Sequence, residues 1–216
     1  MTRTNKQCSL IATTVLVVFL LPALLAFGQE DEQWKWNDPR EKLPPGVQHG
    51  TIESPSMMRT VGFNVYLPPE YTAEPERRFP VVYFLHGAGG TESSDVGFAY
   101  RVHSEVKAGT IPPVIYVFPN GGAKSGYRDW TDKNIKSETL IIRELIPHID
   151  KAYRTKDNAG ARGICGFSMG GNGALRFCVK YPDLFGTAAS LGAGLPSGAD
   201  DRDGDNILRV AITKIG

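Results

Sequence analysis

The chain has 216 residues, of which 41% are hydrophobic and 22% are charged, and its formal net charge is +1. These values are ordinary for a globular protein of one domain. The near-zero charge argues against a nucleic-acid partner, because nucleic-acid-binding proteins carry a clear excess of lysine and arginine.

The first 28 residues have the pattern of a secretory signal. Arg3 and Lys6 precede a stretch without charge, and Ala26-Phe27-Gly28 places small residues at the two positions that a signal peptidase reads. We therefore expect cleavage after Gly28, and a secreted or periplasmic protein without a stable membrane association. The alternative is an uncleaved membrane anchor, because the apolar run approaches the ~18 residues that can span a bilayer.

Residues 29–46 are polar and contain three prolines, so we expect a linker there and the folded domain over 47–216. Cys165 and Cys178 are the cysteines that follow the signal. The first is expected on a core strand and the second on the next helix, so two buried free thiols are favoured over a disulfide.

Strands and helices alternate along the predicted domain. Apolar runs predict strands at 61–67, 81–85, 114–118, 162–167 and 187–191. A helix is expected from Ser137 onward, where Pro147 can kink it, and another from Ser168 to Lys180. This alternation predicts an α/β fold, with a mostly parallel sheet and helices on both of its faces.

Three glycine-bearing loops follow predicted strands of this sheet. They are His86–Gly90, Asn120–Gly122 and the turn that contains Ser168. Because loops at the carboxyl ends of parallel strands form the binding crevice of such folds, we expect the three loops to meet there.

The turn around Ser168 reads Gly166-Phe167-Ser168-Met169-Gly170, a G-x-S-x-G pattern placed between a predicted strand and a predicted helix. This context is typical of a nucleophilic serine held on a sharp turn. The glycines permit the turn, and the free N–H groups of the helix start can stabilise an oxyanion. The alternative is a tight glycine turn in a binding protein of the same fold.

Longer segments carry a family resemblance. They are NVYLPPEY (64–71), FPVVYFLHGAGG (79–90), PPVIYVFPNGG (112–122), ETLIIRELIPHID (138–150) and GFSMGGNGALRFCVKYPDLFGTAASLGAGL (166–195). With these, the chain resembles the putative-esterase family of α/β-hydrolases, which includes feruloyl esterases, S-formylglutathione hydrolase and enterochelin esterases. The resemblance implies the α/β-hydrolase fold, Ser168 as nucleophile, and the N–H groups of Met169 and Ala88 as the oxyanion hole. We expect no cofactor and no metal.

The family completes its catalytic triad with an acidic residue and then a histidine, both downstream of the serine. The histidines of this sequence are His49, His86, His103 and His148, and all of them precede Ser168. We expect His86 to support the oxyanion loop through hydrogen bonds, and His103 and His148 to be surface residues.

Asp200, Asp201, Asp203 and Asp205 come too early to supply the triad acid, and we expect a solvated turn there. The resemblance therefore predicts a domain that is incomplete at its C-terminus. We expect near-background ester hydrolysis, because losing the histidine of a serine triad costs about 10⁶ in kcat in subtilisin.

Two functions remain open at this point. The first is a secreted serine carboxylic-ester hydrolase, acting on feruloyl or acetyl esters linked to carbohydrate. The second is a non-catalytic α/β-hydrolase-like binding protein. Tyr127 and Trp130 could stack on a sugar or phenolic ring in the crevice, although core packing explains them equally well.

Overall fold

A computed structural model describes residues 34–132 and 134–193 of the chain. The described residues from Lys35 onward belong to one compact unit. The predicted signal at 1–28 and the aspartates of 200–205 lie outside the described residues. None of the described helices is both long and apolar enough to cross a membrane.

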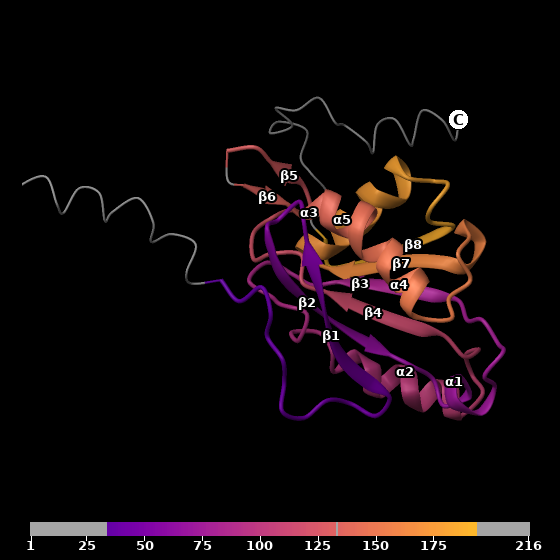
Figure 1. The fold of residues 1–216 in the computed structure, drawn as a ribbon. Coiled ribbons are helices and arrows are strands. Elements are labelled where there is room, and N and C mark those ends of the chain that lie inside the picture. The colour runs from indigo at the N-terminus through magenta and orange to yellow at the C-terminus, as the bar shows by residue number, and fades with distance from the viewer. Residues whose placement is uncertain (1–33, 133, 194–216) are drawn as a thin grey trace, which may run out of the picture. The chain divides into compact units, whose positions relative to one another are not determined.

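Six of the described strands form one mixed sheet in the order β1-β2-β4-β3-β7-β8, and β5 and β6 form a separate hairpin (Figure 1). The strands are β1 (Val47–Ser54), β2 (Arg59–Tyr66), β3 (Val81–Leu85), β4 (Ile115–Pro119), β5 (Asp129–Trp130), β6 (Ile135–Lys136), β7 (Arg162–Phe167) and β8 (Thr187–Leu191). β1 and β2 are antiparallel to their neighbours, whereas β4, β3, β7 and β8 are parallel to one another. The predicted mostly parallel sheet is confirmed.

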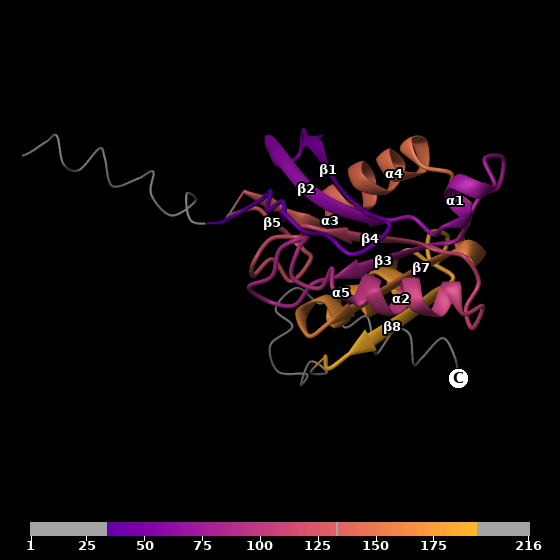
Figure 2. The ribbon, with the colours of Figure 1, turned by 90° about the horizontal axis from the view of Figure 1, so that it is seen from below.

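Helices cover both faces of the sheet, as predicted (Figures 1 and 2). The helical segments are α1 (Glu70–Ala73), α2 (Phe98–Lys107), α3 (Ser137–Thr139), η1 (Leu140–Leu145), α4 (Ile146–Ala152), η2 (Ala159–Ala161) and α5 (Met169–Lys180). Figure 2 places α2 on the side of the sheet that faces the viewer, opposite α4. The chain crosses from β3 through α2 to β4, which is the connection that parallel strands require.

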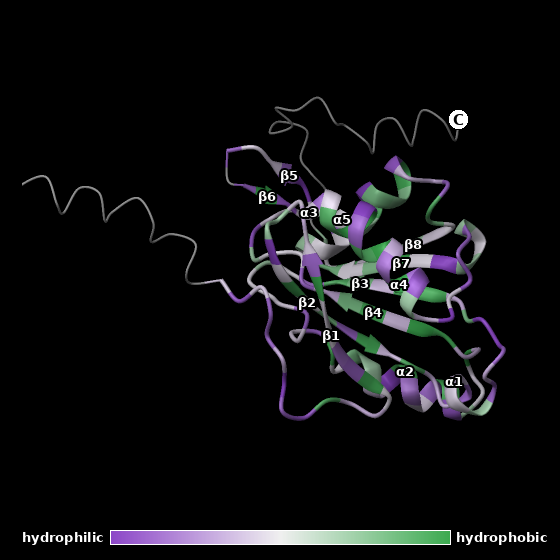
Figure 3. Ribbon diagram, in the orientation of Figure 1, coloured by the Kyte–Doolittle hydropathy of each residue, from purple (hydrophilic) through white to green (hydrophobic). Residues whose placement is uncertain are grey.

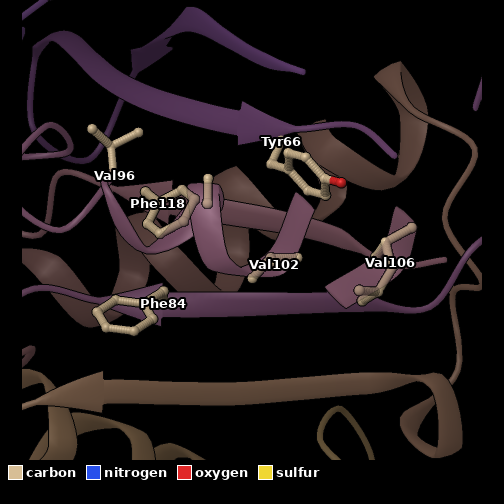
Figure 4. Packing of buried hydrophobic residues seen from close by; sticks show 8 residues of the cluster. Tyr66, Phe84, Val96, Val102, Val106 and Phe118 are labelled. Carbon is tan, nitrogen blue, oxygen red and sulfur yellow. The ribbon is translucent and has the colours of Figure 1, made fainter. Parts of the chain in front are cut away.

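A core of aromatic and branched side chains joins α2 to the sheet. Figure 4 shows Tyr66, Phe84 and Phe118 from three strands beside Val102 and Val106 of the helix. The central strands β3 and β4 consist mostly of apolar residues, which suits strands that are covered on both faces, whereas β1 and β2 mix hydrophilic and hydrophobic residues (Figure 3). Each such side chain contributes about 1.5–3 kcal/mol when fully buried.

The helix predicted from Ser137 is continuous but not regular. Its middle turn, η1, is a π-helix that ends just before α4, and Pro147 stands in the first turn of α4. Proline has no N–H to donate to the preceding turn and its ring crowds that turn, so a locally widened helix accommodates it.

A buried ion pair joins this helix to α5. Glu138 accepts hydrogen bonds from Arg176 at 2.7 Å and from the hydroxyl of Tyr181, and Lys180 Nζ lies 2.9 Å from its carboxylate. Burial alone raises the pKa of Glu138, but these donors outweigh it and hold that pKa at about 2. The carboxylate is therefore charged at neutral pH and pairs with both cations.

The described part of the predicted linker packs against the domain. Trp36 is 9% exposed, and its carbonyl accepts a hydrogen bond from Gly62 N–H at 2.7 Å. Pro44 is buried as well. Polar composition suggested a linker at 29–46, but long-range backbone hydrogen bonds fix residues 35–38, which we call the N-terminal strap.

Candidate active site

Ser168 occupies a sharp turn between β7 and α5. Its backbone has φ 51° and ψ −114°, and it is the N-cap residue of α5. A non-glycine residue rarely adopts such angles, and they are typical of strained positions at functional sites. The turn is held on both sides, because Ser168 N–H donates to Leu191 O at 2.8 Å and Ser168 O accepts from Asn172 N–H at 3.1 Å.

Two glycines of the motif let the turn lie directly against β3. A Cβ added at Gly170 would stand 2.0 Å from the carbonyl oxygen of Leu85, and one added at Gly166 would stand 2.5 Å from the carbonyl carbon of Gly170. Real Cβ atoms do not approach backbone this closely. The spacing of the G-x-S-x-G pattern therefore follows from the contact between the turn and the end of β3.

The loop after β3 lies beside the serine. A Cβ added at Gly87 would be 3.6 Å from the Cβ of Ser168. Ala88 is exposed, and within the described residues neither its N–H nor that of Met169 has an acceptor. Free backbone donors next to a nucleophile can hold the negative oxygen of a tetrahedral intermediate.

His86 supports this loop and is unsuited to be the base for Ser168. Its ring is 2% exposed, Nδ1–H donates to Gly87 O at 2.8 Å, and Nε2 accepts from Gly121 N–H at 3.1 Å. Burial lowers the pKa of His86 to about 4, against the opposing effect of the Gly87 carbonyl. The ring is therefore neutral with both nitrogens occupied, which confirms the predicted supporting role.

The other histidines contact other parts of the domain. His49 Nε2 lies 3.3 Å from Glu92 Oε1, and His103 Nδ1 lies 3.3 Å from the hydroxyl of Tyr66. The ring of His148 packs edge-on against Phe63 with centroids 5.7 Å apart. His103 and His148 were expected to be surface residues, but both are half-buried.

Tyr127 is not available to stack on a substrate, which corrects one of the two interpretations given for it. It is completely buried, and its hydroxyl donates to His86 O at 3.1 Å. Trp130 is half-buried, and its Nε1 donates to Ser125 O at 2.5 Å. The aromatic ring of Tyr127 fits here because Gly121 and Gly173 leave room for it.

Cys165 and Cys178 are both free, as expected, but they are half-buried and not fully buried. Burial raises the pKa of the Cys165 thiol to about 12, which leaves it without nucleophilic thiolate at neutral pH. Across the described ranges, no group of three or more His, Cys, Asp or Glu residues could hold a metal ion.

Residues 54–199 match the family described as Putative esterase. The chain belongs to this esterase family. Esterase Rv1288 of Mycobacterium tuberculosis is 32% identical over 179 residues, which are 82% of this chain and 37% of that protein. An endo-1,4-beta-xylanase/feruloyl esterase of Xylanibacter ruminicola is 33% identical over 163 residues, which are 68% of this chain and 22% of that protein. The chain thus spans less than two fifths of the length of these curated relatives.

Solved structures of esterases share the fold. A ferulic acid esterase has 31% identity and a TM-score of 0.62, over 66% of this chain and 58% of its own. An S-formylglutathione hydrolase from Agrobacterium tumefaciens has 19% identity and a TM-score of 0.60, over 71% of this chain and 61% of its own. The esterase domain described here therefore has the α/β-hydrolase fold.

Sequence reasoning missed two features near this site. One is the N-terminal strap, and the other is the buried side chain of Glu92, which binds the strap. They share the hydrogen bond between Asp38 and Glu92, which lie 54 positions apart in the sequence. The one local signal for this side chain was its position, because Glu92 is an acidic residue that closely follows the His86–Gly90 loop.

Proposed function

We propose that this esterase domain is a serine carboxylic-ester hydrolase in which Ser168 is the nucleophile. The observation that carries the proposal is the backbone of Ser168, at φ 51° between β7 and α5, with the free N–H groups of Ala88 and Met169 beside it. A strained serine next to unpaired donors is what acyl transfer requires.

In the proposed reaction, Ser168 Oγ attacks the ester carbonyl carbon while a base takes the hydroxyl proton. The carbonyl oxygen becomes negative and accepts hydrogen bonds from the N–H groups of Ala88 and Met169. The intermediate then expels the alcohol, and water later releases the acid from the acyl-enzyme. Since His86 is neutral, buried and occupied at both nitrogens, it does not take this proton.

We extend the proposal to the substrate and to export. Feruloyl or acetyl esters attached to carbohydrate are the proposed substrates, supported by the 31% identity to a ferulic acid esterase. The signal pattern of residues 1–28 supports export to the periplasm or the exterior. A non-catalytic binding role is the second candidate, favoured by His86, whose two ring nitrogens are already occupied by other hydrogen bonds.

Imidazole tests the proposal by supplying the proton acceptor. We expect hydrolysis of p-nitrophenyl acetate near background without imidazole, and a rate increase with imidazole that exceeds the increase in Ser168→Ala. A serine site without its full triad can still exceed water by roughly 10³ to 10⁴. Equal imidazole responses in the two proteins would reject Ser168 as nucleophile and favour the binding role.

Two further outcomes are informative. Fast, Ser168-dependent turnover without imidazole would show that another residue of the protein serves as base. A comparison of methyl ferulate with methyl butyrate under the same conditions tests the substrate class. Preference for methyl butyrate would contradict the feruloyl assignment and leave the role of Ser168 intact.

A further inference from the structure

A buried carboxylate lies in the segment that follows the oxyanion loop. Glu92 is 1% exposed, a placement that is unfavourable for a carboxylate unless polar groups surround it. Its Oε1 accepts a hydrogen bond from Asp38 N–H at 2.5 Å and lies 3.3 Å from His49 Nε2, and its Oε2 accepts from Asn120 Nδ2 at 2.7 Å. The proposed reaction does not use this group, so its burial needs another reason.

The partners of this carboxylate come from three segments that are distant in sequence: the N-terminal strap, β1 and the loop after β4. Asp38 of the strap also accepts hydrogen bonds from the two neighbours of Glu92. Thr91 Oγ1 donates to Asp38 Oδ2 at 2.9 Å, and Ser93 Oγ donates to Asp38 O at 2.6 Å. Asn120 Nδ2 also donates to Lys35 O at 2.8 Å. The side chain therefore lies at the junction of three chain segments.

The oxyanion loop is attached to the loop after β4 on both sides of Ala88. Before Ala88, His86 Nε2 accepts a hydrogen bond from Gly121 N–H at 3.1 Å. After it, Gly89 N–H donates to Ala123 O at 2.7 Å, and the Glu92 carboxylate accepts a hydrogen bond from the side chain of Asn120. The position of the Ala88 N–H thus depends on how these two loops are held together.

We propose that Glu92 is the positioning residue of the oxyanion hole. Its carboxylate joins the oxyanion loop to Asn120 and to the strap, and thereby sets where the Ala88 N–H stands relative to Ser168. This inference rests on the proposed function, because only an oxyanion hole makes the place of that N–H matter. Glutamine has the same shape but carries an NH₂ in place of one carboxylate oxygen. That NH₂ would face the N–H of Asp38 or the NH₂ of Asn120, both of which are donors, and the loop would shift.

The test is the dissociation constant for phenylboronic acid, which reports on the oxyanion hole without requiring a catalytic base. Ser168 Oγ forms a bond to boron, the hydroxyl proton goes to solvent, and no bond to boron breaks. The product is a tetrahedral boronate anion with an oxygen in the oxyanion position, and ¹¹B NMR distinguishes it from the free trigonal acid. Each variant is measured at a temperature at which circular dichroism shows it folded.

We expect Ser168→Ala to abolish the tetrahedral signal and Glu92→Gln to raise the dissociation constant at least about tenfold, since a 1 Å misplacement can cost ~10²-fold. Asp150→Asn is the matched control. Asp150 pairs with Arg162 at 2.7 Å at the first residue of β7, whereas Ser168 follows the last. This control should lower the melting temperature and leave the dissociation constant within about twofold of wild type.

Should Glu92→Gln fail to fold, Asn120→Ala replaces it, because it removes the donor that faces the carboxylate, and the same weakening is expected. An unchanged dissociation constant in Glu92→Gln or Asn120→Ala would overturn the inference and leave the proposed function standing. A wild-type protein that forms no tetrahedral boronate would overturn the proposed function, and the positioning role with it.

Discussion

Removing the hydroxyl of Ser168 in two different ways should separate its chemistry from its backbone strain. Ser168→Ala and Ser168→Gly both delete the nucleophile, but only glycine adopts φ 51° and ψ −114° without a steric cost. A residue held in such a region costs about 1–3 kcal/mol. Glycine loses up to ~1 kcal/mol more conformational entropy on folding. We therefore expect Ser168→Gly to be about 1–2 kcal/mol more stable than Ser168→Ala.

Urea unfolding followed by circular dichroism measures this difference, provided that the two variants share one m-value. For a domain of this size, the same difference corresponds to a melting temperature roughly 2–8 °C higher for the glycine variant. Equal stabilities, or a more stable alanine variant, would refute the reasoning. The turn would then not be strained, and the unusual angles of Ser168 would need another cause.

Two further predictions concern the packing around the site. Gly170→Ala should abolish Ser168-dependent boronate binding and lower the melting temperature, because its Cβ would stand 2.0 Å from Leu85 O; an unaffected variant would contradict that contact. The second concerns Glu138, whose folded pKa of about 2 lies below the usual 4.5. Its stabilisation of up to about 3 kcal/mol is therefore complete above about pH 4.5 and is lost as the pH falls toward 2. Glu138→Gln should lose that pH dependence in urea titrations at pH 7 and pH 3, and parallel curves for the two proteins would argue against the ion pair.

The strands of the parallel part of the sheet were predictable because their signal is local. The runs at 81–85, 162–167 and 187–191 coincide with β3, β7 and β8. A strand between two helical layers is a short apolar run, as in β3, and β8 ends where Gly192 begins.

Elements with a thin apolar stripe escaped prediction. In β1 the buried positions are Ile52 and Ser54, so the strand alternates weakly and contains Gly50. In α2 the buried residues are Ala99, Val102 and Val106, and no side chain caps its start. These elements depend on contacts with the rest of the domain more than on their own pattern.

The same division holds at the site. Ser168 and its turn were predictable because the constraint acts within five residues. The burial of Tyr127 was not, because it depends on the nearby Gly121 and also on Gly173, which lies in another element. The partners of Glu92 likewise come from residues 38, 49 and 120. Pairing over such separations has no period or motif that a single sequence displays.

The N-terminal strap extends the compact unit beyond the segment that the family model matches. The family match begins at residue 54, and the strap and all of β1 except Ser54 precede it. A protein expressed from residue 54 would leave Gly62 N–H without its acceptor and the Glu92 carboxylate without its backbone donor. Each buried polar group left unpaired costs about 1–3 kcal/mol. Recombinant versions of this domain should therefore begin before Lys35, although the family match begins at residue 54.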